Sequence, residues 1–253
     1  MGEAYIVDAV RTPVGRRGGG LSEEHPADLG AHVIQGLVER TGIDPSAVDD
    51  VIMGCLDNMG PQAGDIARTA WLAAGMPEAI PGVTVDRQCG SGQQAVSFAA
   101  MGVMSGVQDM VVAGGIQNMS LIPIGSAMDV MGHEAIGHPE IEDPYTTSKG
   151  WVERYGTQEV SQFRGAELIA KKWNLSRQQL EEFALESHER AAKAQDEGRF
   201  DKEILPYGEI TQDEGVRRGT TLEKMAQLPT LEEGGVITAC LLYTSDAADD
   251  VRG

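Results

Sequence analysis

The first 119 residues alternate between segments with the pattern of a strand and segments with the pattern of a helix. Strand-like runs fall at 4–10, 48–56, 82–88 and 109–119, and helix-like runs fall at 26–42, 65–75 and 92–106. Alternation of this kind is typical of crossover connections that place successive strands side by side in parallel. We therefore predict an α/β fold in which helices cover a largely parallel sheet.

The character of the sequence changes near residue 120. Residues 120–150 are rich in Gly, Pro, Met and His without a sustained period, which indicates a long excursion over the surface or across a subunit contact. Helical patterns follow at 157–173 and 177–198, and Ser176 and Gln179 fit a capping box at the start of the second one. This half of the chain is expected to be built from loops and helices.

Three segments follow from this division. We predict an α/β domain at 1–119 and a loop domain at 120–239. The last fourteen residues, 240–253, continue no earlier pattern and are expected to form a frayed acidic tail.

Charge and cysteine content exclude several classes of protein. The net charge of −19 argues against nucleic acid or an anionic membrane as a partner, because both select for basic surfaces. No apolar run approaches the roughly 20 residues that span a bilayer, and the N-terminus lacks the layout of a signal peptide, so a cytoplasmic location is expected. Three cysteines without CxxC spacing argue against a disulfide framework and a zinc site, so we expect no metal.

One cysteine stands where a strand-like run meets a helix-like run, in the stretch VTVDRQCGSGQQAVSFAAMG. A strand that ends at Gln88 and a helix that begins near Ser91 place Cys89 at a strand-to-helix turn. Gly90 and Gly92 allow the backbone to bend sharply there and to approach a ligand.

A thiol at the start of a helix is well placed for nucleophilic chemistry. The N–H groups and the positive end of the helix dipole stabilise a thiolate, and the same N–H groups can hold the oxyanion that forms when sulfur attacks a carbonyl. The following helix, 92–106, is apolar on several faces and is expected to be central and buried. The alternative is that Cys89 is an inert buried thiol.

Other candidate residues have weaker patterns. Cys55 in VIMGCL fits the buried core of a strand. Arg217-Arg218 forms a local basic cluster in an acidic chain, and the alternative interpretation is that the pair lies in an ordinary solvated loop. A solvated or structural role is expected for each of the five histidines, which are His25, His32, His133, His138 and His188.

Several segments resemble the thiolase family. VDRQCGSGQQA is similar to the thiolase nucleophile motif, and the similarity continues in family order through IVDAVRTPVGRRGG, GDIARTAWLAAGMP, AGGIQNMS, GRFDKEI, DEGVRRGTTLEKM and LEEGGVITA. The resemblance runs from about residue 3 to 239. It looks most like the bacterial acetyl-CoA acetyltransferase branch, including members that act late in steroid or fatty-acid breakdown.

The resemblance implies a thiolase-like N-terminal half with a loop domain, and it assigns roles to particular residues. Cys89 would carry the acyl group as a thioester in a ping-pong transfer, with coenzyme A and acyl-CoA as substrates and no permanently bound cofactor. Arg217 would lie near the adenine and phosphates of coenzyme A, and Tyr155-Gly156 near its pantetheine arm. The excursion at 121–138 would join dimers into tetramers, so a homodimer or homotetramer is implied for the full-length form.

The sequence also departs from the family pattern. The second thiolase half supplies an Asn-Glu-Ala-type segment, a histidine in Gly-His-Pro and a second cysteine, and these are missing after Ala239, where CLLYTSDAADDVRG stands instead. The resemblance therefore implies a C-terminally truncated acyltransferase with little turnover. Gly137-His138-Pro139 spells the histidine motif but lies in the excursion and lacks the second glycine, so we do not assign it as the base.

Three other interpretations remain open. The chain can be a non-catalytic module that binds coenzyme A through Arg217, or a cysteine hydrolase in which His133 or His138 reaches Cys89. It can also be an unstable fragment whose sheet exposes an apolar face and invites association.

Overall fold

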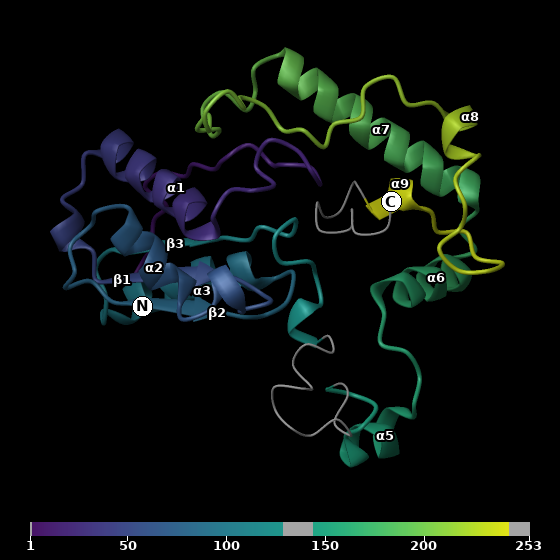
Figure 1. Ribbon diagram of the computed structural model, residues 1–253, viewed down its shortest axis with the longest axis horizontal. Coiled ribbons are helices and arrows are strands. Elements are labelled where there is room, and N and C mark those ends of the chain that lie inside the picture. The colour runs from purple at the N-terminus through teal and green to yellow at the C-terminus, as the bar shows by residue number, and fades with distance from the viewer. Residues whose placement is uncertain (1, 129–143, 243–253) are drawn as a thin grey trace. The chain divides into compact units, whose positions relative to one another are not determined.

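The computed structural model describes residues 2–128 and 144–242, which form two compact units (Figure 1). The first unit comprises Met1–Ile124 and Phe200–Asp213, and the second comprises Gly125–Arg199 and Glu214–Gly253. The observed division falls between residues 124 and 125, and the later segment Phe200–Asp213 belongs to the first unit. The predicted segment limits at 119 and 239 stay a prediction. The tetramer role of 121–138 also stays a prediction, because residues 129–143 lie outside the described part.

The first unit contains a parallel sheet of three strands in the order β2-β1-β3. The strands are β1 (Asp50–Gly54), β2 (Gly82–Val85) and β3 (Val111–Gly115), and central Met53 lies opposite Thr84 on one side and Gly114 on the other. The predicted parallel α/β arrangement is confirmed for these strands.

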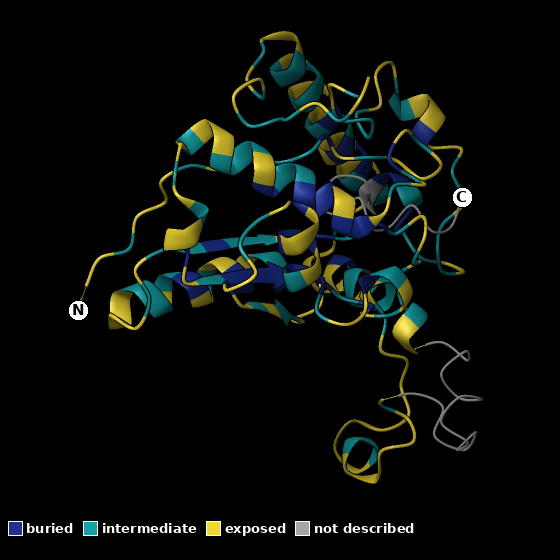
Figure 2. Cartoon of the chain, turned by 60° about the vertical axis from the view of Figure 1, so that its left-hand side comes forward, coloured by how far each residue is buried: buried dark blue, intermediate teal, exposed yellow. Residues whose placement is uncertain are grey.

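Helices cover both faces of this sheet. The helices are α1 (Pro26–Thr41), α2 (Ile66–Ala73) and α3 (Ser91–Ser105), with short 3₁₀ helices at Pro45–Ala47 and Gly60–Gln62. Val51 and Met53 of β1 join the core on the α1 and α2 side, whereas the intervening Ile52 packs with Ala95 and Ala99 of α3. This alternation is the two-residue period of a strand that is buried on both faces. Figure 2 shows buried residues, in dark blue, along the strands.

Both ends of α1 are capped. His25 Nδ1 accepts a hydrogen bond from the Ala27 N–H at 3.2 Å and so caps the helix N-terminus. Gly42 ends the helix with φ at 68°, the left-handed conformation that glycine adopts without a steric cost.

The predicted strand at 4–10 is wrong, since the structure has no strand there. Tyr5, Ile6 and Val7 are 76%, 80% and 80% exposed, and the nearest ladder contact is an isolated bridge between Arg11 and Ile204. A strand pattern forms a strand only beside a partner that accepts its hydrogen bonds, and none of the three strands of the described sheet pairs with this segment.

The segment Phe200–Asp213 is attached to the first unit through Arg11. The Arg11 guanidinium donates to both carboxylate oxygens of Asp213, at 2.6 and 3.0 Å, and to Glu203 at 2.8 Å. The backbone of Arg11 also exchanges hydrogen bonds with Glu203 and Leu205. This bidentate ion pair fixes a segment that is distant in sequence onto the α/β layer.

The second unit is built from helices, within the residues that the structure describes. These are α5 (Lys149–Tyr155), α6 (Gln162–Trp173), α7 (Arg177–Asp196), α8 (Leu222–Met225) and α9 (Ala239–Leu242), with a 3₁₀ turn at Ser126–Met128. The capping box predicted from Ser176 and Gln179 is confirmed at the start of α7.

Two contacts hold the later chain against these helices. Glu167 of α6 accepts hydrogen bonds from the N–H groups of Val236 and Ile237, at 2.8 and 2.7 Å. Cys240 is 8% exposed and belongs to a small core with Ala184. The expectation of a frayed tail is therefore wrong at its first residue, because an apolar side chain found a core to pack against, while residues 243–253 lie outside the described part.

Candidate active site

Cys89 lies in the turn between β2 and α3, four residues after Val85 and two before Ser91, with Gly90 as the helix N-cap. It is exposed and takes part in no disulfide. The predicted strand-to-helix position is confirmed and the thiol is not buried, while its role as a nucleophile stays a prediction.

The turn that carries Cys89 is held by hydrogen bonds of its own residues. Ser91 is 4% exposed, and its Oγ accepts from the Arg87 N–H at 2.8 Å and donates to the Gln88 carbonyl at 2.5 Å. Gln88 has φ at 49°, a left-handed conformation that is uncommon for a residue with a side chain and costs on the order of 1 kcal/mol. The hydrogen bonds of Ser91 were not predicted, although serine at a helix N-terminus is itself a signal for local hydrogen bonding.

Glycines bring the start of α3 against the carboxyl ends of the strands. A Cβ atom on Gly54, the last residue of β1, would overlap the peptide between Ser91 and Gly92. A Cβ atom on Gly115 would lie 3.3 Å from the Gly54 carbonyl and 3.5 Å from the Gly92 Cα. This close approach places Cys89 at the carboxyl edge of a parallel sheet, where α/β proteins bind their ligands.

The arrangement is suited to attack on a carbonyl group. The first N–H groups of a helix have no acceptor within the helix, and they carry the positive end of its dipole. An exposed thiol beside them can act as a nucleophile. The Gly90 and Ser91 N–H groups already donate to the Arg87 and Gln88 carbonyls, at 3.1 and 3.0 Å, so other N–H groups of the helix start would have to hold the oxyanion that results.

The helix behind Cys89 differs from the prediction of a central buried helix. Only Ser91, Gln94, Ala95 and Ala99 of α3 are buried, and four apolar side chains are exposed by 39–60%: Val96, Phe98, Met101 and Met104. In the described part of the chain, the sheet covers one face of α3. The remaining surface of the helix therefore keeps exposed apolar side chains, which we call the α3 outer face and define by these four residues.

The two other cysteines are buried. Cys55 is 2% exposed, its Sγ lies 3.3 Å from the Leu56 carbonyl, and burial, with Asp57 and Asp86 nearby, raises the pKa of its thiol to about 11. Burial also raises the pKa of Cys240, whose Sγ lies 2.8 Å from Thr238 Oγ1. The predicted core position is confirmed for Cys55, which is buried directly after β1, whereas the burial of Cys240 was not predicted.

Arg217 and Tyr155 belong to the second unit, and Cys89 belongs to the first. Arg217 is exposed, and its backbone N–H donates to His188 Nδ1 at 3.3 Å. Tyr155 ends α5 with 45% exposure; its ring lies 4.7 Å from that of Trp151, and the Arg154 guanidinium lies 5.2 Å from its centroid. The roles assigned to Arg217 and Tyr155 stay predictions.

The described histidines have structural contacts. His25 caps α1, the His32 ring meets Tyr207 edge-on with centroids 5.0 Å apart, and His188 is 6% exposed. His188 is thus structural, as predicted, but buried rather than on a solvated side. His133 and His138, and with them Gly137-His138-Pro139, lie outside the described residues.

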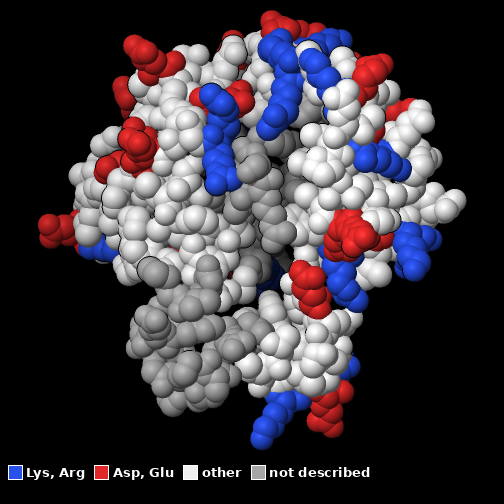
Figure 3. Space-filling model, turned by 45° about the vertical axis from the view of Figure 1, so that its right-hand side comes forward, with Lys and Arg blue, Asp and Glu red and all other residues white. Residues whose placement is uncertain are grey.

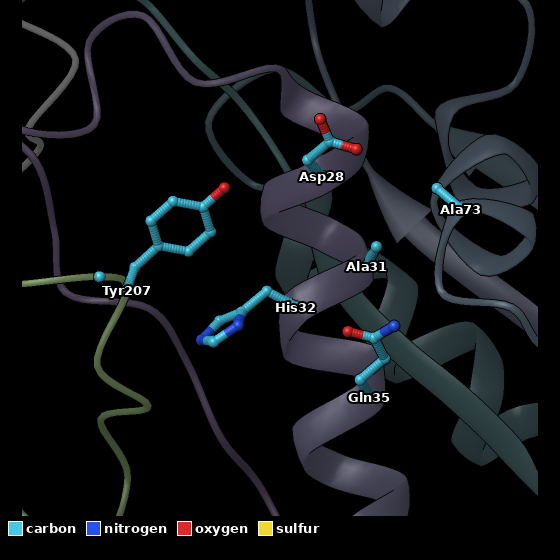
Figure 4. A pocket seen from close by; sticks show the side chains of 7 residues that line it. Asp28, Ala31, His32, Gln35, Ala73 and Tyr207 are labelled. Carbon is cyan, nitrogen blue, oxygen red and sulfur yellow. The ribbon is translucent and has the colours of Figure 1, made fainter.

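A cavity of about 380 Å³ lies in the first unit, between α1 and the segment that carries Tyr207 (Figure 4). Tyr207 Oη donates to Glu24 at 2.9 Å, and burial together with this bond raises the pKa of Tyr207 to about 12. Gln35 Nε2 donates to the Ala74 carbonyl at 3.1 Å. The lining residues are Asp28, Ala31, His32, Gln35, Ala73, Tyr207 and Gly208, so the cavity contains no thiol.

Charge is distributed in a mixed pattern on the face drawn in Figure 3, where basic and acidic side chains are interspersed. A chain with a net charge of −19 can still present local cations to an anionic ligand. Among the described residues there is no helix long and apolar enough to cross a membrane. The same residues hold no cluster of three His, Cys, Asp or Glu side chains that could bind a metal ion.

Comparison with known proteins gives consistent matches. The family model described as thiolase, N-terminal domain, matches residues 4–248. The steroid 3-ketoacyl-CoA thiolase FadA6 of Mycobacterium tuberculosis is 57% identical over 256 residues, which cover 99% of this chain and 61% of that protein. The 3-oxoadipyl-CoA/3-oxo-5,6-dehydrosuberyl-CoA thiolase of Escherichia coli is 37% identical over 94% of this chain and 62% of its own.

A solved structure agrees with these relatives. The acetyl-CoA acetyltransferase of Bacillus anthracis superposes with a TM-score of 0.74 at 33% identity, covering 95% of this chain and 62% of that one. The chain thus spans about three fifths of the length of the proteins that it matches.

Proposed function

Because the chain belongs to the thiolase family, whose N-terminal domain it matches over residues 4–248, we propose that it supplies the acyl-accepting site of a thiolase-type acyltransferase. The observation that carries the proposal is the exposed Cys89 thiol in the turn that opens α3. A cysteine needs an accessible sulfur and a group that stabilises negative charge to act as a nucleophile, and this turn offers both.

The proposed reaction passes through a thioester on Cys89. In the degradative direction the Cys89 thiolate attacks the 3-keto carbon of a 3-ketoacyl-CoA, and N–H groups at the start of α3 hold the oxyanion. When that tetrahedral intermediate collapses, the bond between carbons 2 and 3 breaks, and the two-carbon piece leaves as an enolate that is protonated to acetyl-CoA. The thiolate of a second coenzyme A then attacks the thioester, releases the shortened acyl-CoA and restores the Cys89 thiolate.

Acetoacetyl-CoA synthesis is the reverse sequence, with two acetyl-CoA molecules as substrates. Coenzyme A and acyl-CoA enter as substrates in both directions, and no permanently bound cofactor is proposed. The relative at 57% identity is named for a steroid 3-ketoacyl-CoA, which supports a steroid-derived acyl group as the first substrate to test.

We also propose low turnover, on the contacts of the described histidines. A thiolase needs a proton donor and acceptor for the leaving enolate, and a nucleophile that acts without such groups is slower by orders of magnitude. The described histidines His25, His32 and His188 are engaged with Ala27, Tyr207 and Arg217. We therefore propose that acyl transfer to Cys89 is observable as a single event, whereas repeated turnover is slow.

Coenzyme A binding is assigned to Arg217 and Tyr155 on the same family resemblance. Arg217 is an exposed cation, and a guanidinium recognises phosphate oxygens well. A homodimer or homotetramer of the full-length form and a cytoplasmic location complete the proposal. The cytoplasmic location is supported by three cysteines outside disulfides, since thiols are kept reduced in the cytosol.

The test is to incubate the protein with acetyl-CoA or acetoacetyl-CoA and to locate adducts by peptide mass spectrometry. An acetyl group on Cys89, absent from Cys55 and Cys240 and lost in Cys89→Ser, is the expected result. A protein that binds coenzyme A but stays unmodified would instead be a non-catalytic binding module. If Cys89 stays unmodified and the protein does not bind coenzyme A, the result contradicts both the acyltransferase and the binding module.

A further inference from the structure

His188 is a buried histidine whose contact no catalytic role explains. It lies on α7 and is 6% exposed, and its Nδ1 accepts a hydrogen bond from the backbone N–H of Arg217 at 3.3 Å. An imidazole nitrogen accepts a hydrogen bond only when it carries no proton. The bond therefore requires the neutral tautomer of His188 with its proton on Nε2.

The next residue of the same loop is attached to the same helix. The Arg218 guanidinium donates to both carboxylate oxygens of Asp196, at 3.1 and 2.8 Å. It also donates to the Gln195 side chain at 3.2 Å and to the Ala192 carbonyl at 3.3 Å. Two consecutive loop residues are thus fixed on α7, Arg217 by its backbone and Arg218 by its side chain.

This attachment leaves the Arg217 side chain exposed while its backbone is held. When an ion pair forms on a mobile loop, the entropy lost in ordering the loop cancels much of the binding free energy. A loop whose backbone is already fixed loses less entropy on binding. The environment also favours the neutral imidazole, because burial and the nearby Arg217 charge lower the pKa of His188.

We propose that His188 is a positioning residue, whose Nδ1 fixes the Arg217 backbone so that the Arg217 guanidinium meets the phosphates of coenzyme A. This inference rests on the proposed function, since it takes Arg217 as a phosphate ligand. It adds His188 to that function as a residue that does not touch the substrate. It also explains why two arginines are adjacent in this loop: Arg218 anchors the loop to α7, and Arg217 binds the phosphates.

The test compares two substitutions. His188→Asn keeps an acceptor oxygen near the position of Nδ1, whereas His188→Leu removes the acceptor. The dissociation constants of coenzyme A and of pantetheine, which lacks the phosphates and adenine, are measured for each variant by calorimetry. Hydrogen exchange of the Arg217 amide reports on the bond directly.

Loss of one hydrogen bond predicts about threefold to tenfold weaker coenzyme A binding for His188→Leu. His188→Asn should bind within about twofold of the parent, and pantetheine binding should be the same in both variants. The Arg217 amide should exchange faster in His188→Leu. Arg217→Ala should weaken coenzyme A binding, and adding His188→Leu to it should weaken binding little further, because the two residues act through one contact.

Three results would overturn the inference. Parent-like coenzyme A binding by His188→Leu excludes the positioning role but leaves the proposed function standing. Equal losses in both variants for coenzyme A and pantetheine mean that His188 serves packing alone. Failure of the unaltered protein to bind coenzyme A overturns the proposed function and the positioning role together. If His188→Leu does not fold, His188→Gln replaces it. The glutamine amide lies one bond farther from the backbone than the asparagine amide, so its oxygen does not take the position of Nδ1.

Discussion

Gly54 at the end of β1 lies so close to Gly92 in the first turn of α3 that a Cβ atom on Gly54 would overlap the Gly92 nitrogen. The contact joins the carboxyl end of the central strand to the helix start that carries the Cys89 turn. The position of the Cys89 thiol therefore depends on Gly54, which lies 35 residues earlier in the chain.

Replacing Gly54 with alanine should displace the start of α3. The overlap involves backbone atoms, which cannot move aside as a flexible side chain can, so we expect a loss of about 1–3 kcal/mol in the free energy of unfolding. We also expect slower alkylation of Cys89 in the folded variant. Urea unfolding and the rate of iodoacetamide labelling measure the two effects.

Gly92→Ala is the matched control for this substitution. A Cβ atom on Gly92 would lie 3.9 Å from the Gly114 carbonyl, which is an ordinary contact, so its stability should stay near that of the parent. Equal stabilities for the Gly54 and Gly92 variants would show that the close approach does not constrain the turn.

Much of the first unit could be predicted because its signals are local. Hydrophobic periodicity located β1 and α2, and the cysteine between a strand and a helix marked the site. Each of these depends on a segment and its immediate neighbours, which a sequence displays directly.

The errors arose where the outcome depends on a distant partner. Residues 4–10 have the pattern of a strand, but the pattern does not state whether a neighbouring strand is available. The α3 outer face has the composition of a buried helix, yet burial requires a second covering layer. The burial of His188 was not predicted, because its contact with Arg217, 29 residues later, is not visible in the periodicity of α7.

The three cysteines should react at very different rates. At pH 8, iodoacetamide is expected to label Cys89 first and Cys55 on the order of a hundredfold more slowly, because a thiol with a pKa of about 11 is almost entirely protonated there. Cys240 is also buried with a raised pKa and should be slow. Peptide mass spectrometry over time measures each site, and unfolding in urea should make all three reactive. Equal labelling of Cys55 and Cys89 in the folded protein would contradict the structure.

The α3 outer face should cause concentration-dependent association. Phe98 and Met101 are three residues apart on one side of the helix and are 40% and 60% exposed, so water contact with both is unfavourable. Changing both to serine should shift the protein toward the monomer in sedimentation velocity. Gln93→Ser alters an exposed polar residue of the same helix and serves as the control. If the double variant associates as strongly as this control, another surface causes association.

The stability of the protein should fall as the pH is lowered from about 6.5, because of His188. Its pKa in the folded state is lowered from the ordinary 6.5 by burial and by Arg217, so the unfolded chain takes up the proton first. The free energy of unfolding therefore decreases from pH 6.5 down to the folded-state pKa. Asp49 and Asp196 also have lowered pKa values, but they lose their contribution only below 3.8, outside this window. Urea unfolding at pH 7.5 and 5.0 should show a smaller decrease for His188→Asn than for the parent, and identical decreases would mean that His188 titrates normally in the folded protein.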